Sequence, residues 1–212
     1  MEYTTLGNTG LKVSVAGLGC GGNSRLGMRT GLTEEESIGI VKKALDLGVT
    51  LFDTAEAYKT ETILGKALSG LDRDSIVVTT KANIGNADAP RSGADIIECL
   101  EASLQKLQMD YVDVYQMHGV HFSRYDEVMA EIVPHLQKAQ QAGKIKYLGI
   151  TETSPNDPTH KMLERAVADG VWEVVMLGYN MMNQTARERL FPLIQKHGIG
   201  TLLMFVVRNI FS

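Results

Sequence analysis

The stretch VTLFDTAEAYKTE, residues 49–61, is an apolar run that stops at Asp53 and is followed five residues later by Tyr58. A carboxylate at the end of a buried strand costs desolvation free energy unless another group satisfies it. The stretch therefore predicts a strand over residues 49–53 whose final acid has a partner elsewhere in the chain.

Six other short apolar runs, rich in Val, Ile and Leu and bounded by turn residues, also predict strands. They are residues 13–20, 75–81, 111–118, 145–151, 173–180 and 199–207. Longer amphipathic stretches between the runs predict helices, at residues 32–48, 92–108, 124–143, 154–170 and 184–198. The first of these has Thr33 at the N-cap and Glu36 at the capping-box position.

Alternating strands and helices, with strands apolar on both faces, predict a parallel sheet covered by helices. The sheet could be a doubly wound open sheet or an eight-stranded barrel. Gly17, Gly19 and Gly22 fit a dinucleotide-binding G-x-G-x-x-G pattern, but no helical periodicity follows them. The next suitable acid, Asp53, lies 31 residues beyond Gly22 rather than about 20. The barrel is therefore the better interpretation, with a hairpin around residues 8–10 at its lower end.

The predicted fold class is thus α/β, a TIM (β/α)8-type barrel with about seven βα units in 212 residues. We expect residues 1–212 to form a single barrel domain that is C-terminally incomplete. Such a barrel takes about 250 residues, and no eighth strand follows the seventh predicted one. The sequence is therefore expected to belong to a longer chain.

The composition, 44% hydrophobic and 22% charged, is that of an ordinary globular protein. A formal net charge of -4, with basic residues scattered among acids, argues against a nucleic-acid or membrane-surface partner. Two cysteines and no apparent signal sequence or membrane span favour a cytoplasmic protein. A small-molecule substrate is the expected partner, and the oligomeric state stays open.

Titratable side chains lie at the ends of three successive predicted strands, where the active site of a barrel is built. Asp53 ends the second, Lys81 the third and His118 the fourth, while Tyr58 lies in the loop after the second. We expect all four side chains at one mouth. A nearby ammonium would lower the pKa of the Tyr58 phenol from about 10, and Asp53 would pair with Lys81.

Such a site can protonate a carbonyl oxygen, with His118 as a hydrogen-bond partner of that oxygen. It contains no metal cluster or nucleophile of its own, so a hydride-donating cofactor is expected to supply the electrons. Two alternatives remain open. Lys81 could form a Schiff base, as in an aldolase, or the barrel could sense nucleotides without turnover.

The segments TLGNTGLKVS, VAGLGCGG, FDTAEAY, VTTK, DYVDVYQMH, IKYLGIT and VVMLGYN together resemble the aldo-keto reductases along the whole chain. The resemblance is greatest to the bacterial and plant branch related to galactose- or aldose-type dehydrogenases. It implies an NAD(P)-dependent oxidoreductase that transfers a hydride between a nicotinamide and a small aldehyde, ketone or sugar. It further implies that Tyr58 is the general acid or base, Lys81 lowers its pKa, Asp53 supports Lys81, and His118 orients the carbonyl.

The resemblance also implies a set of residues that contact the cofactor, NADP or NAD. They are Gly19, Cys20, Gly21, Asp53, Thr151, Glu152, Met204 and Phe205. Thr151-Glu152 stands where the family commonly has Ser-Asn for the nicotinamide carboxamide. Met176 replaces an expected Gln, and Met204 replaces an expected stacking aromatic residue, a role that could pass to Phe205.

Arg208 is a candidate contact for a phosphate or a polar substrate. In the family, the residues around the last strand bind the adenosine phosphate, so the choice between NAD and NADP stays open. The substrate and the preferred reaction direction stay open as well.

Overall fold

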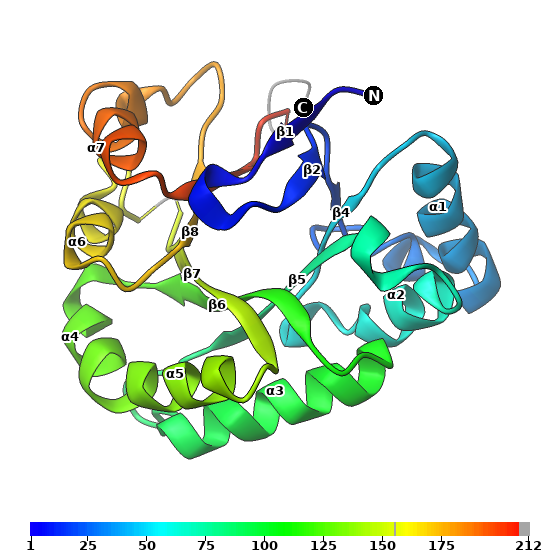
Figure 1. Cartoon of the computed structure of the whole chain (residues 1–212), viewed down its shortest axis with the longest axis horizontal. Helices are drawn as coiled ribbons and strands as arrows, with labels where there is room; N and C mark the ends of the chain where they lie inside the picture. Colours follow the sequence, from blue (N-terminus) through cyan, green and yellow to red (C-terminus); the bar gives the residue numbers. More distant parts are fainter. Residues whose placement is uncertain (155, 208–212) are drawn as a thin grey trace.

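A computed structural model describes residues 1–154 and 156–207 of the chain. Seven parallel strands form a curled sheet in the order in which they occur along the chain (Figure 1). They are β3 (Leu18–Gly19), β4 (Leu51–Asp53), β5 (Val77–Asn83), β6 (Val112–Val120), β7 (Ile145–Glu152), β8 (Val174–Gly178) and β9 (Gly200–Met204). Within the described residues the sheet is open between β3 and β9. The predicted barrel-type α/β fold is therefore confirmed.

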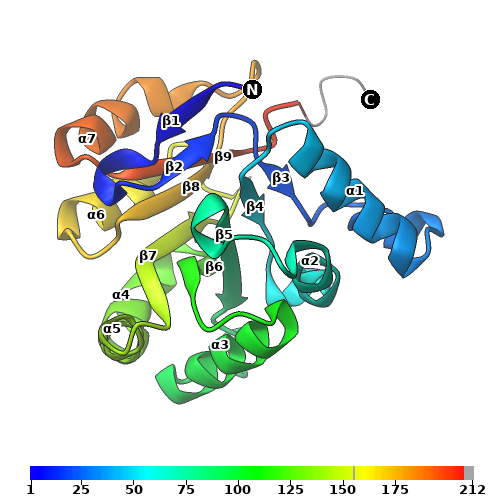
Figure 2. The same ribbon diagram turned by 45° about the vertical axis from the view of Figure 1, so that its right-hand side comes forward.

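Helices cover the outer face of this sheet (Figure 2). They are α1 (Glu34–Asp46), α2 (Glu61–Leu68), α3 (Gly93–Leu107), α4 (Tyr125–Glu127), the π-helical turn η6 (Val128–Ile132), α5 (Val133–Gln141), α6 (Lys161–Asp169) and α7 (Leu190–His197). The capping box at the start of α1 is present as predicted. Helix α2 was not among the predicted helices, because eight residues are too few to show a clear helical period. In the described part of the chain, no helix has the length and apolarity that a membrane span needs.

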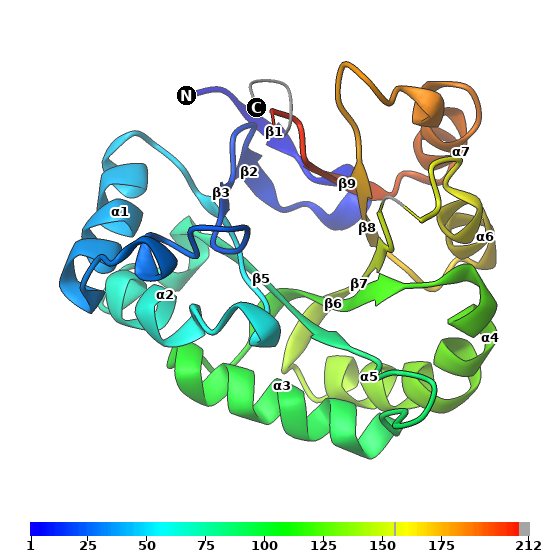
Figure 3. The ribbon, with the colours of Figure 1, turned by 180° about the vertical axis from the view of Figure 1, so that it is seen from behind.

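The first predicted strand is in fact two strands, because the chain bends at residues 15–17. Residues Tyr3–Thr5 (β1) and Lys12–Ser14 (β2) form an antiparallel hairpin, and only Leu18–Gly19 (β3) joins the parallel sheet. The hairpin turn contacts the start of β9, where the Asn8 backbone N–H donates to the Gly198 carbonyl at 2.7 Å. Figure 3 shows the hairpin across the end of the curled sheet. The predicted closure of the lower end is confirmed.

The inner face of the sheet carries an apolar layer below a polar one. The buried apolar residues of this layer are Leu51, Val77, Val114, Val174, Met176 and Leu202 on the strands, together with Leu6 and Val13 from the N-terminal hairpin. Side chains on a strand alternate between faces, so the residue two places on returns to the same face. Leu51 is thus followed by Asp53 on β4, and Val77 by Thr79 on β5. Strand periodicity alone therefore brings polar side chains together above the apolar layer.

Two of the strands that carry candidate catalytic residues end later than predicted. Strand β5 continues past Lys81 to Asn83, because Asn83 pairs with His118. Strand β6 continues past His118 to Val120, because Val120 pairs with Glu152 on β7. Lys81 and His118 therefore lie inside their strands, whereas Asp53 ends β4 as predicted.

The glycine-rich segment after β3 does not open a helix directly. It forms turns and the short 3-10 helix η2 (Met28–Thr30) before α1 begins at Glu34. The rejection of a dinucleotide-binding glycine turn is therefore confirmed.

Candidate active site

A buried ion pair joins strands β4 and β5 in the polar layer. Lys81 Nζ donates to both carboxylate oxygens of Asp53, at 2.6 and 2.7 Å, and to the Thr54 carbonyl oxygen at 2.8 Å. The Lys81 side chain is fully buried, and that of Asp53 is 18% exposed. The predicted pairing of Asp53 with Lys81 is confirmed. Three acceptors around one ammonium satisfy all three of its protons, which offsets the cost of burying the charge.

Two further polar side chains support Asp53, and the sequence analysis did not single them out. The Thr79 hydroxyl donates to Asp53 Oδ1, and Gln116 Nε2 contacts Thr79 Oγ1 at 3.0 Å and Asp53 Oδ1 at 3.3 Å. Thr79 is two residues before Lys81, and Gln116 lies opposite Lys81 in the sheet register. Because side chains alternate between the two faces of a strand, the spacing along β5 and β6 predicts Thr79 and Gln116 on the inner face.

Tyr58 lies close to this pair, on the short 3-10 helix η3 (Glu56–Tyr58) that follows β4. The centre of its ring is 5.2 Å from Lys81 Nζ and 5.6 Å from the centre of the His118 ring, which meets it edge-on at 89°. The four predicted residues are therefore brought together at one mouth. Arg25, from the loop before α1, also donates to the Tyr58 carbonyl oxygen at 3.2 Å.

The electrostatics of Tyr58 differ from the prediction that Lys81 lowers its pKa. Burial raises the pKa of the Tyr58 phenol well above its usual value, and the Asp53 carboxylate raises it further, while Arg25 lowers it. The physical reason is that Asp53 balances the charge of Lys81, so the phenol does not face an uncompensated cation. At neutral pH Tyr58 is therefore a protonated phenol, which suits a proton donor.

His118 is half-buried beside this ion pair. Burial lowers the pKa of its imidazole to about 4, and the Lys81 charge lowers it further against the opposing effects of Asp53 and Glu56. The ring is therefore neutral near pH 7, with one nitrogen that donates a hydrogen bond and one that accepts.

The three candidate cofactor residues at the end of β3, Gly19 to Gly21, have different environments. An added Cβ at Gly19 would meet nothing within 4 Å, whereas one at Gly21 would lie 2.5 Å from the Tyr58 ring. The Cys20 side chain is fully buried in the core between sheet and helices. Burial raises the pKa of the Cys20 thiol to about 12. Gly19 therefore leaves open space at the end of β3, and Cys20 has a packing role.

At the end of β7, Thr151 and Glu152 are both buried. Thr151 Oγ1 accepts a hydrogen bond from the Gly119 backbone N–H at 2.6 Å, and within the described residues its own proton has no hydrogen-bond acceptor. The Glu152 carboxylate accepts from the Gly178 backbone N–H at 2.9 Å and contacts His160 Nδ1 at 2.7 Å. In the part of the chain that the structure describes, Thr151 thus has a free hydroxyl donor, whereas both Glu152 oxygens already have partners.

The remaining candidates lie on β8 and β9. Met176 belongs to the inner apolar layer, and Met204 packs against that layer. Phe205 follows β9 with a left-handed backbone, φ 63°, and its carbonyl oxygen accepts from Asn180 Nδ2 at 3.3 Å. Arg208 lies outside the described residues.

The sequence profile of the Aldo/keto reductase family matches residues 17–209. L-galactose dehydrogenase of Arabidopsis thaliana is 33% identical over 208 residues, which cover 95% of this chain and 64% of that protein. Aldo-keto reductase YhdN of Bacillus subtilis is 35% identical over 214 residues, which cover 96% of this chain and 61% of that protein. The chain thus spans less than two thirds of the length of these curated relatives.

Solved structures give the same result. The holo form of aldo-keto reductase AKR11C1 from Bacillus halodurans superposes with a TM-score of 0.77 at 31% identity. The superposition covers 96% of this chain and 65% of that one. Because the family profile matches nearly the whole chain and the solved fold agrees, this chain belongs to the Aldo/keto reductase family.

Proposed function

We propose that this protein is an NAD(P)-dependent oxidoreductase that transfers a hydride between a nicotinamide and a small carbonyl compound or alcohol. In this proposal Tyr58 is the proton donor, Lys81 and Asp53 form the charged support beneath it, and His118 orients the carbonyl. One observation carries the proposal: a buried ammonium–carboxylate pair lies 5.2 Å from the ring of a phenol that an imidazole contacts edge-on.

The protonation states favour this assignment. A phenol with a raised pKa keeps its proton at neutral pH and can donate it to an oxygen that gains negative charge during reduction. A neutral His118 can donate a hydrogen bond to the same oxygen without transferring its own proton. In the direction of alcohol oxidation, the same two groups would accept the proton and align the hydroxyl.

A nicotinamide dinucleotide, NADP or NAD, would supply or accept the hydride at this mouth. The open space at Gly19 and the uncommitted Thr151 proton fit a flat ring that carries a carboxamide. We propose that these residues and Phe205 hold the nicotinamide end. Glu152 would act indirectly, since both of its oxygens already have partners.

The substrate class in this proposal is a small aldehyde, ketone or sugar. The sugar is included because one relative is named for L-galactose dehydrogenation. The cytoplasm is the proposed location, because both Cys20 and Cys99 are free thiols, as in proteins of reducing compartments.

The test is a steady-state assay that follows cofactor absorbance with NADPH and NADH against a panel of aldehydes, ketones and sugars. Turnover by the unaltered chain, with a fall in kcat of about 10²–10⁴-fold in Tyr58→Phe, is the expected result. Cofactor binding without turnover across the panel would instead favour a nucleotide-sensing barrel.

The alternative with Lys81 as a Schiff-base nucleophile has less support from the contacts of its ammonium group. A nucleophilic amine needs a free lone pair, yet Nζ donates to three acceptors, two of them the oxygens of the Asp53 carboxylate and the third the Thr54 carbonyl oxygen. Borohydride trapping checks this directly: covalent capture of a carbonyl compound on Lys81 would overturn the hydride proposal.

A further inference from the structure

Tyr58 does not lie on a strand, so the parallel ladder does not fix its position. It is the last residue of the three-residue 3-10 helix η3 (Glu56–Tyr58), which has no side-chain hydrogen bond at its N-cap. Lys59, in a left-handed conformation with φ 60°, ends the turn. One turn of 3-10 helix has little stability of its own, so side-chain contacts must hold the phenol in place.

The first residue of this turn makes such contacts. Glu56 Oε1 accepts from the backbone N–H of Asn83 at 3.3 Å and from Asn83 Nδ2 at 3.1 Å, and it forms an ion pair with Arg91. Arg91 Nη1 also donates to the Asn83 carbonyl oxygen at 3.1 Å. Asn83 is the last residue of β5, two residues beyond Lys81. The Glu56 carboxylate therefore joins the turn that carries Tyr58 to the strand that carries Lys81.

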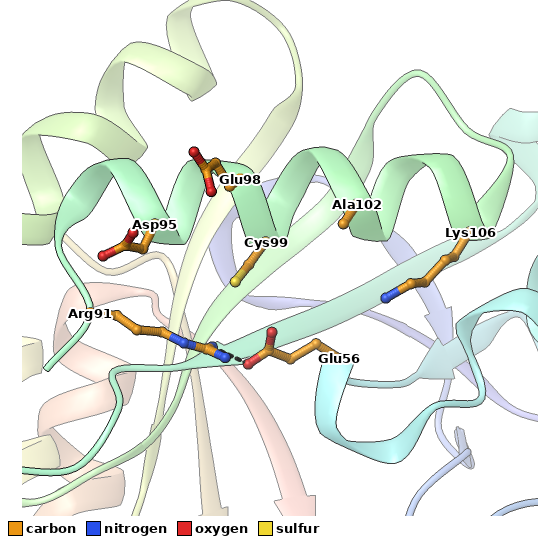
Figure 4. Close-up of a pocket in the computed structure, with 7 residues that line it drawn as sticks. All are labelled: Glu56, Arg91, Asp95, Glu98, Cys99, Ala102 and Lys106. Carbon is orange, nitrogen blue, oxygen red and sulfur yellow. Dashed lines mark hydrogen bonds and ion pairs between the residues drawn. The ribbon is translucent and has the colours of Figure 1, made fainter. Parts of the chain in front are cut away.

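Figure 4 shows the ion pair in a pocket of about 430 Å³ beneath helix α3. The sulfur of Cys99 points from the helix toward the pair. Burial and a hydrogen bond to Glu56 raise the pKa of the Cys99 thiol to about 11, so it stays a neutral donor. Glu56 thus lines this pocket, while Tyr58, two residues later, contacts His118 in the mouth.

Because the Glu56–Arg91 pair is partly buried, its contacts contribute to the stability of the folded turn. The Glu56 side chain is 15% exposed and that of Arg91 is 33% exposed, so water screens them less than a fully exposed surface pair. Hydrogen bonds to a charged group are also stronger than neutral ones. A second contact to the turn comes from Arg25, which donates to the Tyr58 carbonyl oxygen.

We propose that Glu56, through its bonds to Arg91 and Asn83, is a positioning residue that fixes the Tyr58 phenol over the Lys81–Asp53 pair. Its catalytic consequence rests on the proposed function, whereas the placement of Tyr58 does not. A reacting group displaced by about 1 Å loses up to about 10²-fold in rate, so a freed turn should lower kcat.

The test compares Glu56→Gln with Glu101→Gln as a matched control. Glu101 also forms an ion pair, with Lys144 on the outer surface, and both partners are 42% exposed. Each variant is labelled with ¹³C at the tyrosine Cζ, and the Tyr58 signal is assigned by its loss in Tyr58→Phe. Its pH titration then reports the surroundings of the phenol without any turnover.

In Glu56→Gln the pKa of Tyr58 is expected to fall toward its ordinary value, because a loosened turn admits water. A fall in kcat of about 10–100-fold, with KM changed by less than about threefold, should accompany it. In Glu101→Gln both quantities should match the unaltered chain. Arg91→Lys keeps the positive charge and should retain more of the rate than Arg91→Met.

An unchanged Tyr58 titration in Glu56→Gln would overturn the positioning role, whatever the rates show. If the unaltered chain shows no turnover while the titration still shifts, the placement of Tyr58 is supported and the proposed function fails instead. Should Glu56→Gln fail to fold, Arg91→Lys and Arg91→Met decide the question, since equal titrations in those two variants would overturn the proposal.

Discussion

Gly21 lies against the ring of Tyr58. A methyl group added at Gly21 would be 2.5 Å from one ring carbon and 2.7 Å from another, closer than real side chains approach. Two residues away, an added Cβ at Gly19 would meet nothing within 4 Å. The position of the Tyr58 ring therefore requires glycine at position 21, whereas Gly19 borders open space.

Gly21→Ala is accordingly expected to move the Tyr58 ring and lower kcat by about 10–100-fold, with the fold retained. Steady-state rates and circular dichroism measure the two effects. Gly39→Ala, on helix α1, is the matched control, because an added Cβ there also meets nothing within 4 Å, and it should leave kcat unchanged. Equal rates in Gly21→Ala and the unaltered chain would contradict the close approach.

The Lys81–Asp53 pair should behave as a coupled unit in unfolding. Lys81→Met leaves the Asp53 carboxylate without its cation and should lower the free energy of unfolding by about 3 kcal/mol. This is the lower end for a buried pair, because the Asp53 side chain is 18% exposed. Adding Asp53→Asn to Lys81→Met should cost less than the two single changes summed. Strictly additive urea-unfolding data would show that the two charges are not coupled.

The imidazole of His118 should make stability depend on pH. Burial lowers its pKa from 6.5 to about 4 in the folded chain, so between these values the unfolded chain binds more protons. The free energy of unfolding should therefore fall as the pH is lowered from about 6.5 to about 4. In His118→Gln this contribution should be absent. Urea unfolding at a series of pH values measures it, and identical pH dependences would argue against the lowered pKa.

Thr79 should matter to the site through its hydrogen bond to Asp53. Thr79→Val removes a hydrogen bond from Asp53 Oδ1 and leaves Gln116 Nε2 without its nearer acceptor, a cost of about 1–2 kcal/mol. We expect lower stability and a reduced kcat, because Asp53 loses part of its orientation. Thr79→Ser keeps the hydroxyl and should restore both. Loss of function in the serine variant as well would indicate a packing role for the Thr79 methyl group.

The strands and helices can be predicted from the sequence because the periodicity that indicates each element lies within that element. Periodicity placed six of the seven parallel strands, and the capping box at Thr33 placed the start of α1. The first strand was misread as continuous, because a hairpin strand and a sheet strand share the same apolar composition. Helix α2 was missed because it is short and buries Glu61 among apolar residues.

Part of the candidate site can be predicted from the sequence. Asp53, Lys81 and His118 are polar residues in or at the ends of apolar runs, and barrel geometry brings such positions to one mouth. Thr79 and Gln116 were missed because uncharged polar residues inside a strand look like ordinary packing. Glu56 was missed because nothing in its spacing relates it to Arg91, 35 residues away.

The sequence by itself determined the order of strands and helices, the barrel-type fold and the pairing of Asp53 with Lys81. These follow from periodicity and from the cost of leaving a buried charge alone. Only the tertiary structure decided the direction of the Tyr58 pKa, because that direction depends on how deeply the phenol is buried and on its closeness to the Asp53 carboxylate. The tertiary structure also decided which side chains contact the turn that carries Tyr58, because Asn83 and Arg91 are distant from Glu56 in the sequence.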